Sequence, residues 1–224
     1  PGDAVINTPF THIATAEVIA ILGATPIFID IYEKTFNIDP DGIEEAVIFA
    51  KKQNLVPKAI IPVDLFGLPA RYRLINEIAK KHSLIVIEDF AQAFGSSIGD
   101  KKAGSFGDVS ATSFYPAKPL GCYGDGGAIF TDYDDLAEKI KSIRVHGAGD
   151  NKYQNIRIGL NGRLDTLQAA ILLEKFNIFH DELVMRDKVA NYYDENIDSR
   201  LIKPHVPKNY KSSWAQYSLL AKDK

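Results

Sequence analysis

The alternation of short apolar stretches with helical stretches most constrains how this chain can fold. Most of the apolar stretches are continuous, which is typical of strands covered on both faces. The candidate strands are residues 4–7, 26–31, 58–66, 84–90, 108–115 and 127–132. This alternation predicts an α/β fold with a mainly parallel sheet flanked by helices, which binds its ligands at the carboxyl ends of the strands.

Three predicted helices between the strands have recognisable ends. Asp39 and Pro40 are typical of an N-cap followed by proline in the first helical turn. A second helix is predicted over 70–82. A third, over 132–146, has three aspartates in its first turn and stops at Gly147.

The strand signals fade after this point, and the C-terminal part is predicted to be mainly helical. Residues 163–197 are expected to form two helices, over 163–179 and 182–196. The stretch 198–211 has two prolines and is predicted to be a linker, and 213–223 is predicted to begin a strand.

This pattern predicts two domains. Residues 1–180 would form a large cofactor-binding α/β domain, and 181–224 the beginning of a smaller C-terminal domain that is incomplete. The chain opens without an initiator methionine, so we expect that the N-terminal part of the large domain is missing as well.

Composition excludes several classes of protein. Lys and Arg (26) nearly balance Asp and Glu (29), so no broad positive field is available to attract nucleic acid. No apolar run approaches the roughly 20 residues of a membrane helix. The single cysteine, Cys122, excludes an internal disulfide and a Cys-based zinc site and fits a reducing cytoplasm. The five histidines are scattered, and no metal site is predicted.

Two polar residues lie at the end of the candidate strand 84–90. Asp89 closes the strand, and Gln92 follows three residues later. An aspartate at this point can cap a following helix. It can also hold a cationic ring nitrogen of a cofactor, with Gln92 reaching the same ring, and this segment alone leaves both interpretations open.

A lysine in an unusual setting follows the next strand. Lys118 lies between Pro116 and Pro119, in SFYPAKPLGCYGDGG (113–127). Most lysines are solvated surface charges, but a lysine amine in a partly dry pocket can attack a carbonyl and form a Schiff base. The glycines of this segment can bring the backbone close to a ligand, although GDGG is also a good hairpin turn.

Three further residues are candidates for binding anions. Ser113, at the end of the same candidate strand, can donate to a phosphate or satisfy loop backbone. Asn161 and Arg163 precede a helix. The fork of an arginine suits a carboxylate or a phosphate, yet most arginines near a helix start are simply exposed.

These features together resemble the DegT/DnrJ/EryC1/StrS family of sugar-nucleotide aminotransferases, which use pyridoxal phosphate on the type I aminotransferase fold. The segments that carry the resemblance are 9–31, 35–47, 58–70, 86–95, 104–132 and 159–172. The resemblance implies that Lys118 holds the cofactor covalently and that Asp89 pairs with its ring nitrogen. It also implies that Gln92 lies by the ring and its phenolic oxygen, and that Ser113 binds the phosphate.

The resemblance also implies roles for three other residues. Asn161 matches an asparagine that reaches the phosphate from the neighbouring subunit, which implies a homodimer with shared active sites. Arg163 is a candidate for a carboxylate of substrate or amino donor. The family usually has an aromatic residue stacked on the cofactor ring where this chain has His12, and its phosphate-binding Gly-Thr segment would lie upstream of residue 1.

The resemblance further suggests a substrate. Segments 9–17, 112–130 and 163–176 are similar to enzymes that aminate C3 of a UDP-linked 3-keto-N-acetylglucosaminuronic acid for surface polysaccharide, with glutamate as the usual donor. Aminotransfer at C4 of another keto-sugar nucleotide and a non-catalytic scaffold of the same fold are the alternatives. A dehydratase is less favoured, because the family's dehydratases replace the lysine by histidine, and Lys118 is intact.

Overall fold

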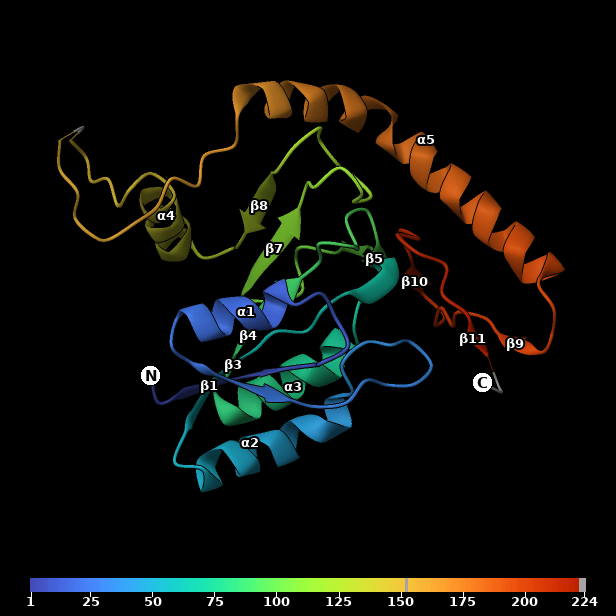
Figure 1. Cartoon of the computed structure of the whole chain (residues 1–224), viewed down its shortest axis with the longest axis horizontal. Coiled ribbons are helices and arrows are strands. Elements are labelled where there is room, and N and C mark those ends of the chain that lie inside the picture. Colours follow the sequence, from blue (N-terminus) through green and yellow to red (C-terminus); the bar gives the residue numbers. More distant parts are fainter. Residues whose placement is uncertain (152, 222–224) are drawn as a thin grey trace.

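A six-stranded sheet forms the centre of the computed structural model, which describes residues 1–151 and 153–221 (Figure 1). Its strands are β1 (Asp3–Asn7), β2 (Thr25–Phe28), β3 (Val56–Ile60), β4 (Ile85–Asp89), β7 (Val109–Ser113) and β8 (Gly127–Phe130). Their order is β2-β1-β3-β4-β7-β8, and only β8 runs antiparallel to its neighbour. The predicted α/β architecture with a mainly parallel sheet is confirmed.

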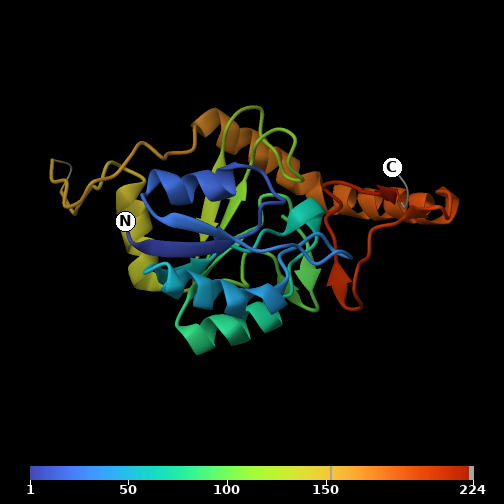
Figure 2. The same ribbon diagram turned by 60° about the horizontal axis from the view of Figure 1, so that its bottom comes forward.

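Helices cover both faces of this sheet. Figure 2 shows α1 (Ala14–Ile21) on one side and α2 (Ile43–Lys52) with α3 (Tyr72–His82) on the other. The Asp39 side chain accepts a hydrogen bond from the Asp41 backbone N–H (3.3 Å) at the start of a short 3₁₀ turn, η1 (Pro40–Gly42), that leads into α2. The predicted cap is therefore confirmed.

The sequence analysis did not predict α1 as a helix. Its apolar residues are not confined to one face, since Ala16 and Ile19 are buried while Val18 and Ile21 are exposed. A helix without a one-sided apolar stripe gives no clear 3.6-residue periodicity. The physical signal that would have revealed α1 is therefore weak.

Two of the strands end at least three residues earlier than predicted. β2 ends at Phe28 rather than at residue 31, and β3 ends at Ile60 rather than at residue 66. Pro62 has no N–H to donate to a neighbouring strand, and a 3₁₀ turn, η2 (Leu65–Gly67), follows it. The chain therefore turns across the carboxyl edge of the sheet directly after β3.

The C-terminal part contains α4 (Asp134–Ile143) and α5 (Thr166–Asn196). The prediction of two helices within 163–197 is wrong, because α5 is one helix of 31 residues. Its sequence contains no Gly or Pro that would interrupt the backbone hydrogen bonds. It runs through residue 180, and the division into domains 1–180 and 181–224 stays a prediction.

Two small sheets involve the C-terminal segment. They are β5 (Ser97–Ile98), β6 (Lys101–Lys102) and β10 (Tyr210–Lys211), in the order β10-β5-β6, and β9 (Leu201–Ile202) paired with β11 (Leu220–Ala221). The first of these sheets joins the segment to the rest of the molecule through the pairing of β10 with β5. The predicted linker 198–211 therefore carries β9 and β10. The strand predicted from residue 213 is wrong over 213–219, where the chain lies against η2 and the Ser213 N–H donates to the Gly67 carbonyl (2.9 Å). The last two residues of that prediction, 222 and 223, lie outside the described residues.

None of the helices in the described part of the chain is long and apolar enough to cross a membrane.

Candidate active site

Asp89 ends β4 at the carboxyl edge of the sheet. Its Oδ2 accepts a hydrogen bond from Thr15 Oγ1 (2.8 Å), and its Oδ1 accepts from the Ala91 backbone N–H (3.2 Å). The residues that follow Asp89 form a turn and not a helix, so the helix-cap interpretation is wrong. Thr15 belongs to the first turn of α1, which therefore lies next to the end of β4.

Ser113 lies at the same edge of the sheet. β4 and β7 are parallel neighbours, with Asp89 paired with Ala111, so Ser113 is two residues beyond that pair. Its Oγ accepts from the Tyr115 backbone N–H (3.2 Å), which leaves the hydroxyl proton for another acceptor. The sheet therefore brings the carboxylate of Asp89 and the hydroxyl of Ser113 to adjacent strand ends.

Lys118 lies in the connection between β7 and β8, and this loop closes on itself. The Lys118 N–H donates to the Tyr115 carbonyl (2.9 Å), and the Cys122 N–H donates to the Phe114 carbonyl (2.7 Å). A Cβ built on Gly121 would lie 2.6 Å from the Tyr115 carbonyl oxygen. This glycine is needed because two parts of the loop pack together, so close approach to a ligand is not required to explain it.

The Lys118 side chain is partly buried, and its Nζ makes neither a hydrogen bond nor an ion pair with any described residue. A partly buried ammonium without a partner is costly unless a ligand satisfies it. The loop thus holds the backbone of Lys118 rigidly while the amine remains open to a ligand.

Gln92 follows Asp89 in the same turn. Its Oε1 accepts from the Phe66 backbone N–H (2.6 Å), and its main-chain carbonyl accepts from Ser213 Oγ (2.8 Å). The bond to Phe66 orients the amide, and the hydrogens on Nε2 are available to donate to a ligand. Gln92 is therefore a donor at this edge.

His12 immediately precedes α1. Its Nδ1 accepts from the Ala14 backbone N–H (3.3 Å), and its carbonyl accepts from the Thr15 N–H (3.3 Å). The side chain is exposed. Since Thr15 binds Asp89 directly, the same turn of chain places His12 beside the strand end that carries Asp89.

Two buried carboxyl groups underlie this edge. Glu88 is fully buried and accepts from Gly104 N–H (2.6 Å), Phe106 N–H (2.8 Å) and Ser110 Oγ (2.8 Å). The second group, Asp64, is also fully buried.

The side chain of Asp64 accepts from the Ala70 N–H (2.8 Å) and the Tyr72 hydroxyl (2.9 Å). Burial raises the pKa of Asp64 well above its ordinary value, and the neighbouring charges of Glu88 and Asp89 raise this pKa further. The carboxyl edge of the sheet is therefore rich in acidic groups.

Sequence reasoning missed Thr15, Glu88 and Asp64. The two acids did leave a signal, because each is a charged residue inside an otherwise apolar stretch, and charged residues are rarely buried without a specific set of partners. Thr15 left none, since a threonine near a helix start is common.

Asn161 and Arg163 lie in the segment between α4 and α5. Both are exposed, in the segment before α5, and Arg163 Nε donates to Asn161 Oδ1 (2.9 Å). Within the described residues, neither makes a hydrogen bond or ion pair with the five other predicted site residues. The side chains of Asn161 and Arg163 therefore bind one another and remain exposed.

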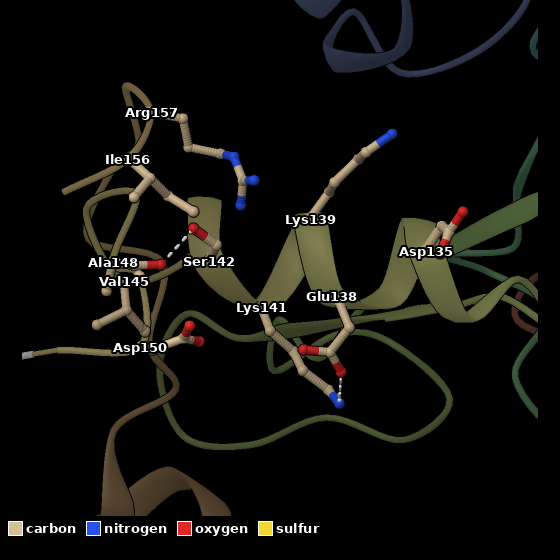
Figure 3. A pocket seen from close by; sticks show the side chains of 11 residues that line it. Asp135, Glu138, Lys139, Lys141, Ser142, Val145, Ala148, Asp150, Ile156 and Arg157 are labelled. Carbon is tan, nitrogen blue, oxygen red and sulfur yellow. Dashed lines mark hydrogen bonds and ion pairs between the residues drawn. The ribbon is translucent and has the colours of Figure 1, made fainter. Parts of the chain in front are cut away.

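Two cavities lie elsewhere. Figure 3 shows one of about 560 Å³ beside α4, where charges of both signs alternate and Lys141 Nζ pairs with Glu138 (2.7 Å). The other, about 900 Å³, lies between α4 and the β7–β8 hairpin and is mainly apolar. Neither is lined by any of the predicted site residues.

The carboxyl edge of the sheet presents one chemically coherent set of groups. An amine comes from Lys118, a carboxylate from Asp89, a hydroxyl from Ser113 and an amide donor from Gln92. This set suits a ligand that combines a carbonyl, a cationic ring nitrogen and an anionic group.

Comparison with known proteins identifies similar chains. Residues 1–224 match the profile of the DegT/DnrJ/EryC1/StrS aminotransferase family. The UDP-2-acetamido-2-deoxy-3-oxo-D-glucuronate aminotransferase of Pseudomonas aeruginosa is 49% identical over 220 residues, which are 98% of this chain and 59% of that protein.

Two solved structures are also similar. A DegT DnrJ EryC1 StrS aminotransferase from Brucella abortus has a TM-score of 0.97 and 49% identity, over 100% of this chain and 60% of that one. NtdA from Bacillus subtilis, with bound cofactor PMP, has a TM-score of 0.85 and 33% identity, over 98% of this chain and 49% of that one. The chain thus spans about three fifths of the length of the curated relative.

Proposed function

The chain belongs to the DegT/DnrJ/EryC1/StrS aminotransferase family, and on this premise we propose that the whole protein is a pyridoxal phosphate-dependent sugar-nucleotide aminotransferase. It transfers an amino group from an amino acid, glutamate by the family's habit, to a keto-sugar nucleotide. The observation that carries the proposal is the unpaired amine of Lys118. Its loop follows Ser113 at the end of β7, the strand adjacent to β4, which ends at Asp89.

The residues at the carboxyl edge fit this cofactor. Asp89 would hold the protonated ring nitrogen, Gln92 would donate to the phenolic oxygen, Ser113 would bind the phosphate, and Lys118 would hold the aldehyde carbon. When bound, the cofactor supplies a ring that accepts electrons from the carbon bearing the amino group. His12 is the residue we propose beside the ring.

Two of these residues have the chemistry that amino transfer needs. The carboxylate of Asp89 receives hydrogen bonds from Thr15 and Ala91, and an anion at this point favours a protonated ring nitrogen. The amine of Lys118, once exchanged for the amine of the substrate, takes a proton from one carbon atom and returns it to another.

The relative from Pseudomonas aeruginosa suggests the substrate. Its name gives UDP-2-acetamido-2-deoxy-3-oxo-D-glucuronate as the sugar nucleotide, and we propose amination at C3 of this UDP-linked 3-keto sugar acid for surface polysaccharide synthesis. The carboxylate of such a sugar suits Arg163, whose guanidinium can bind it through two hydrogen bonds.

A homodimer with shared active sites would complete the site. Asn161 and Arg163 are exposed in one copy, which supports a role in the site of a second copy. The exposed apolar residues of α5, among them Leu167 and Leu173, support a contact between copies. The single free cysteine and the nucleotide-linked substrate support a cytoplasmic location.

The test is a visible absorption spectrum of the full-length protein with added pyridoxal phosphate, followed by borohydride reduction and peptide mass mapping. We expect a yellow band that reduction fixes on the peptide carrying Lys118. A full-length protein that stays colourless in excess cofactor would contradict the proposal and favour a non-catalytic role for the scaffold.

A further inference from the structure

The hydroxyl of Thr15 makes a close contact with the proposed cofactor-binding carboxylate. Its Oγ1 lies 2.8 Å from Asp89 Oδ2, although the two residues are 74 positions apart in the chain. Thr15 is only 6% exposed. We propose that Thr15 is a positioning residue that sets the orientation of the Asp89 carboxylate and, through it, the hold on the cofactor ring, an inference that rests on the proposed function.

The other contacts of Asp89 do not fix the orientation of its carboxylate without Thr15. Oδ1 accepts from the Ala91 N–H at the longer distance of 3.2 Å, within the same turn of chain. Among the described residues, Thr15 is the only side chain that donates to Asp89. A hydrogen bond on one oxygen alone leaves the carboxylate free to rotate, whereas bonds to both oxygens define its plane.

The surrounding charges make a donor at this point more important. Glu88 is adjacent in sequence, and the Asp64 N–H donates to the Asp89 carbonyl (2.9 Å), so two further acidic groups lie close by. The donors of Glu88 all come from elsewhere, namely the 104–107 loop and Ser110. Thr15 therefore serves Asp89 alone within this acidic group.

Thr15 also fixes the position of α1 relative to the strand end. Its backbone N–H donates to the His12 carbonyl, and its hydroxyl binds Asp89. One residue thus joins the turn that carries His12 to the carboxylate. If His12 and Asp89 contact one cofactor ring, the bond from Thr15 sets the spacing between them.

The experiment compares variants of the full-length protein by titration with pyridoxal phosphate, followed by visible absorption across pH. Thr15→Val removes the hydroxyl at nearly constant volume and should weaken cofactor binding about tenfold, as for loss of one charge-assisted hydrogen bond. It should also change the pH dependence of the absorption band. Thr15→Ser keeps the hydroxyl and should restore both properties.

Thr112→Val is the matched control. Thr112 is also a buried threonine, and its Oγ1 donates to the Phe90 carbonyl (3.3 Å), next to Asp89 in sequence but not to the carboxylate. This variant should lower the unfolding temperature without changing cofactor affinity or the pH profile. Equal effects of Thr15→Val and Thr112→Val would show a general packing role and overturn the inference.

A double-mutant cycle with Asp89→Asn gives a second measurement. If Thr15 acts through Asp89, Thr15→Val should change cofactor affinity much less in the Asp89→Asn background than in the wild type. Equal changes in both backgrounds would overturn the inference. Thr15→Ala provides the same comparison if the valine variant folds poorly. A wild-type protein that binds no cofactor would instead overturn the proposed function, and this inference with it.

Discussion

The polar residues discussed above have opposite environments in the two parts of the chain, residues 1–130 and residues 131–221. In residues 1–130, the acids at the carboxyl edge of the sheet have specific donors, and Glu88 alone receives hydrogen bonds from three backbone N–H groups and one hydroxyl. In residues 131–221, Asn161 and Arg163 are exposed and bind one another. Only Leu172, Phe179 and Ala190 of α5 are buried.

This difference indicates what each part can do by itself. The first part supplies the contacts of Asp89. The loop that carries Lys118 also contacts α5, where Gln168 Oε1 accepts from the Tyr123 N–H (2.8 Å). The second part exposes large apolar residues along α5, such as Leu167 (78%) and Leu173 (69%), that another surface has to cover. If this interpretation is right, substitutions in the first part should act within one subunit, and those in the second should act across subunits.

The largest effect is expected from Lys118→Ala in the full-length protein. Loss of the amine removes the group that we propose moves the proton, so amino transfer should fall by at least about 10²–10⁴-fold. The rate is measured with glutamate and the 3-keto sugar nucleotide. Lys102→Ala, which changes an exposed lysine on β6, is the control and should keep full activity. A Lys118→Ala variant with wild-type turnover would refute the catalytic role.

Much of the first part could be predicted from the sequence. All six strands of the main sheet were predicted, because most of their apolar stretches are continuous, although β8 is largely exposed. The strand ends were less certain, since the stop of β3 depends on Pro62 and on the turn at η2. The helix α1 was missed because its exposed face is also apolar.

The next largest effect is expected on stability, from Glu88→Ala. The substitution leaves the buried N–H groups of Gly104 and Phe106 and the hydroxyl of Ser110 without their acceptor. Each unsatisfied buried donor costs about 1–3 kcal/mol, so the free energy of unfolding should fall by at least about 3 kcal/mol. Urea denaturation measures this change. Glu45→Ala, at an exposed position of α2, should have little effect, and equal stabilities of the two variants would contradict the role of the Glu88 network.

The second part can be tested by mixing two inactive variants. Asn161→Ala should reduce kcat/KM about 10–100-fold, the effect of losing one or two charge-assisted hydrogen bonds. When Lys118→Ala and Asn161→Ala subunits are unfolded together and refolded, half of the dimers should contain one of each. One of the two sites in such a dimer is intact, so about a quarter of the wild-type activity should return.

The control for this mixing experiment uses two variants that belong to the same site within one subunit. Lys118→Ala mixed with Asp89→Ala should recover no activity, because Lys118 and Asp89 serve the same site within one subunit and each site of a mixed dimer then lacks one of them. Recovery with Asp89→Ala but not with Asn161→Ala would reverse the proposed assignment. The outcome directly compares the two parts of the molecule.

The site itself was predictable only where a residue type is unusual for its position. Lys118 between prolines stands out in sequence, whereas the hydrogen bond from Thr15 to Asp89 joins segments 74 residues apart. Such a contact depends on how α1 lies relative to the end of β4, and the local sequence around either residue contains no signal of it. Likewise, the roles of the glycines after Lys118 became clear only when Gly121 was found packed against the Tyr115 carbonyl.

The smallest effect concerns the pH dependence of stability. Burial raises the pKa of Asp64 well above its ordinary value of 3.8, and the charge of Glu88 raises it further. The native state therefore keeps a proton that the unfolded chain releases. The stabilising contribution is fully present below the unfolded pKa and is lost as the pH rises toward the raised native pKa.

Asp64→Asn tests this directly, because asparagine does not titrate and retains an oxygen for the Ala70 N–H and the Tyr72 hydroxyl. Wild-type stability relative to the variant should decrease as the pH rises above about 4, by at most about 1.4 kcal/mol per pH unit. Urea unfolding at a series of pH values measures the difference. Parallel profiles would show that the pKa of Asp64 is the same in the native and unfolded states, so that Asp64 is ionised in the native protein. The first part would then contain an unpaired buried charge, in contrast to Glu88, whose carboxylate has four donors.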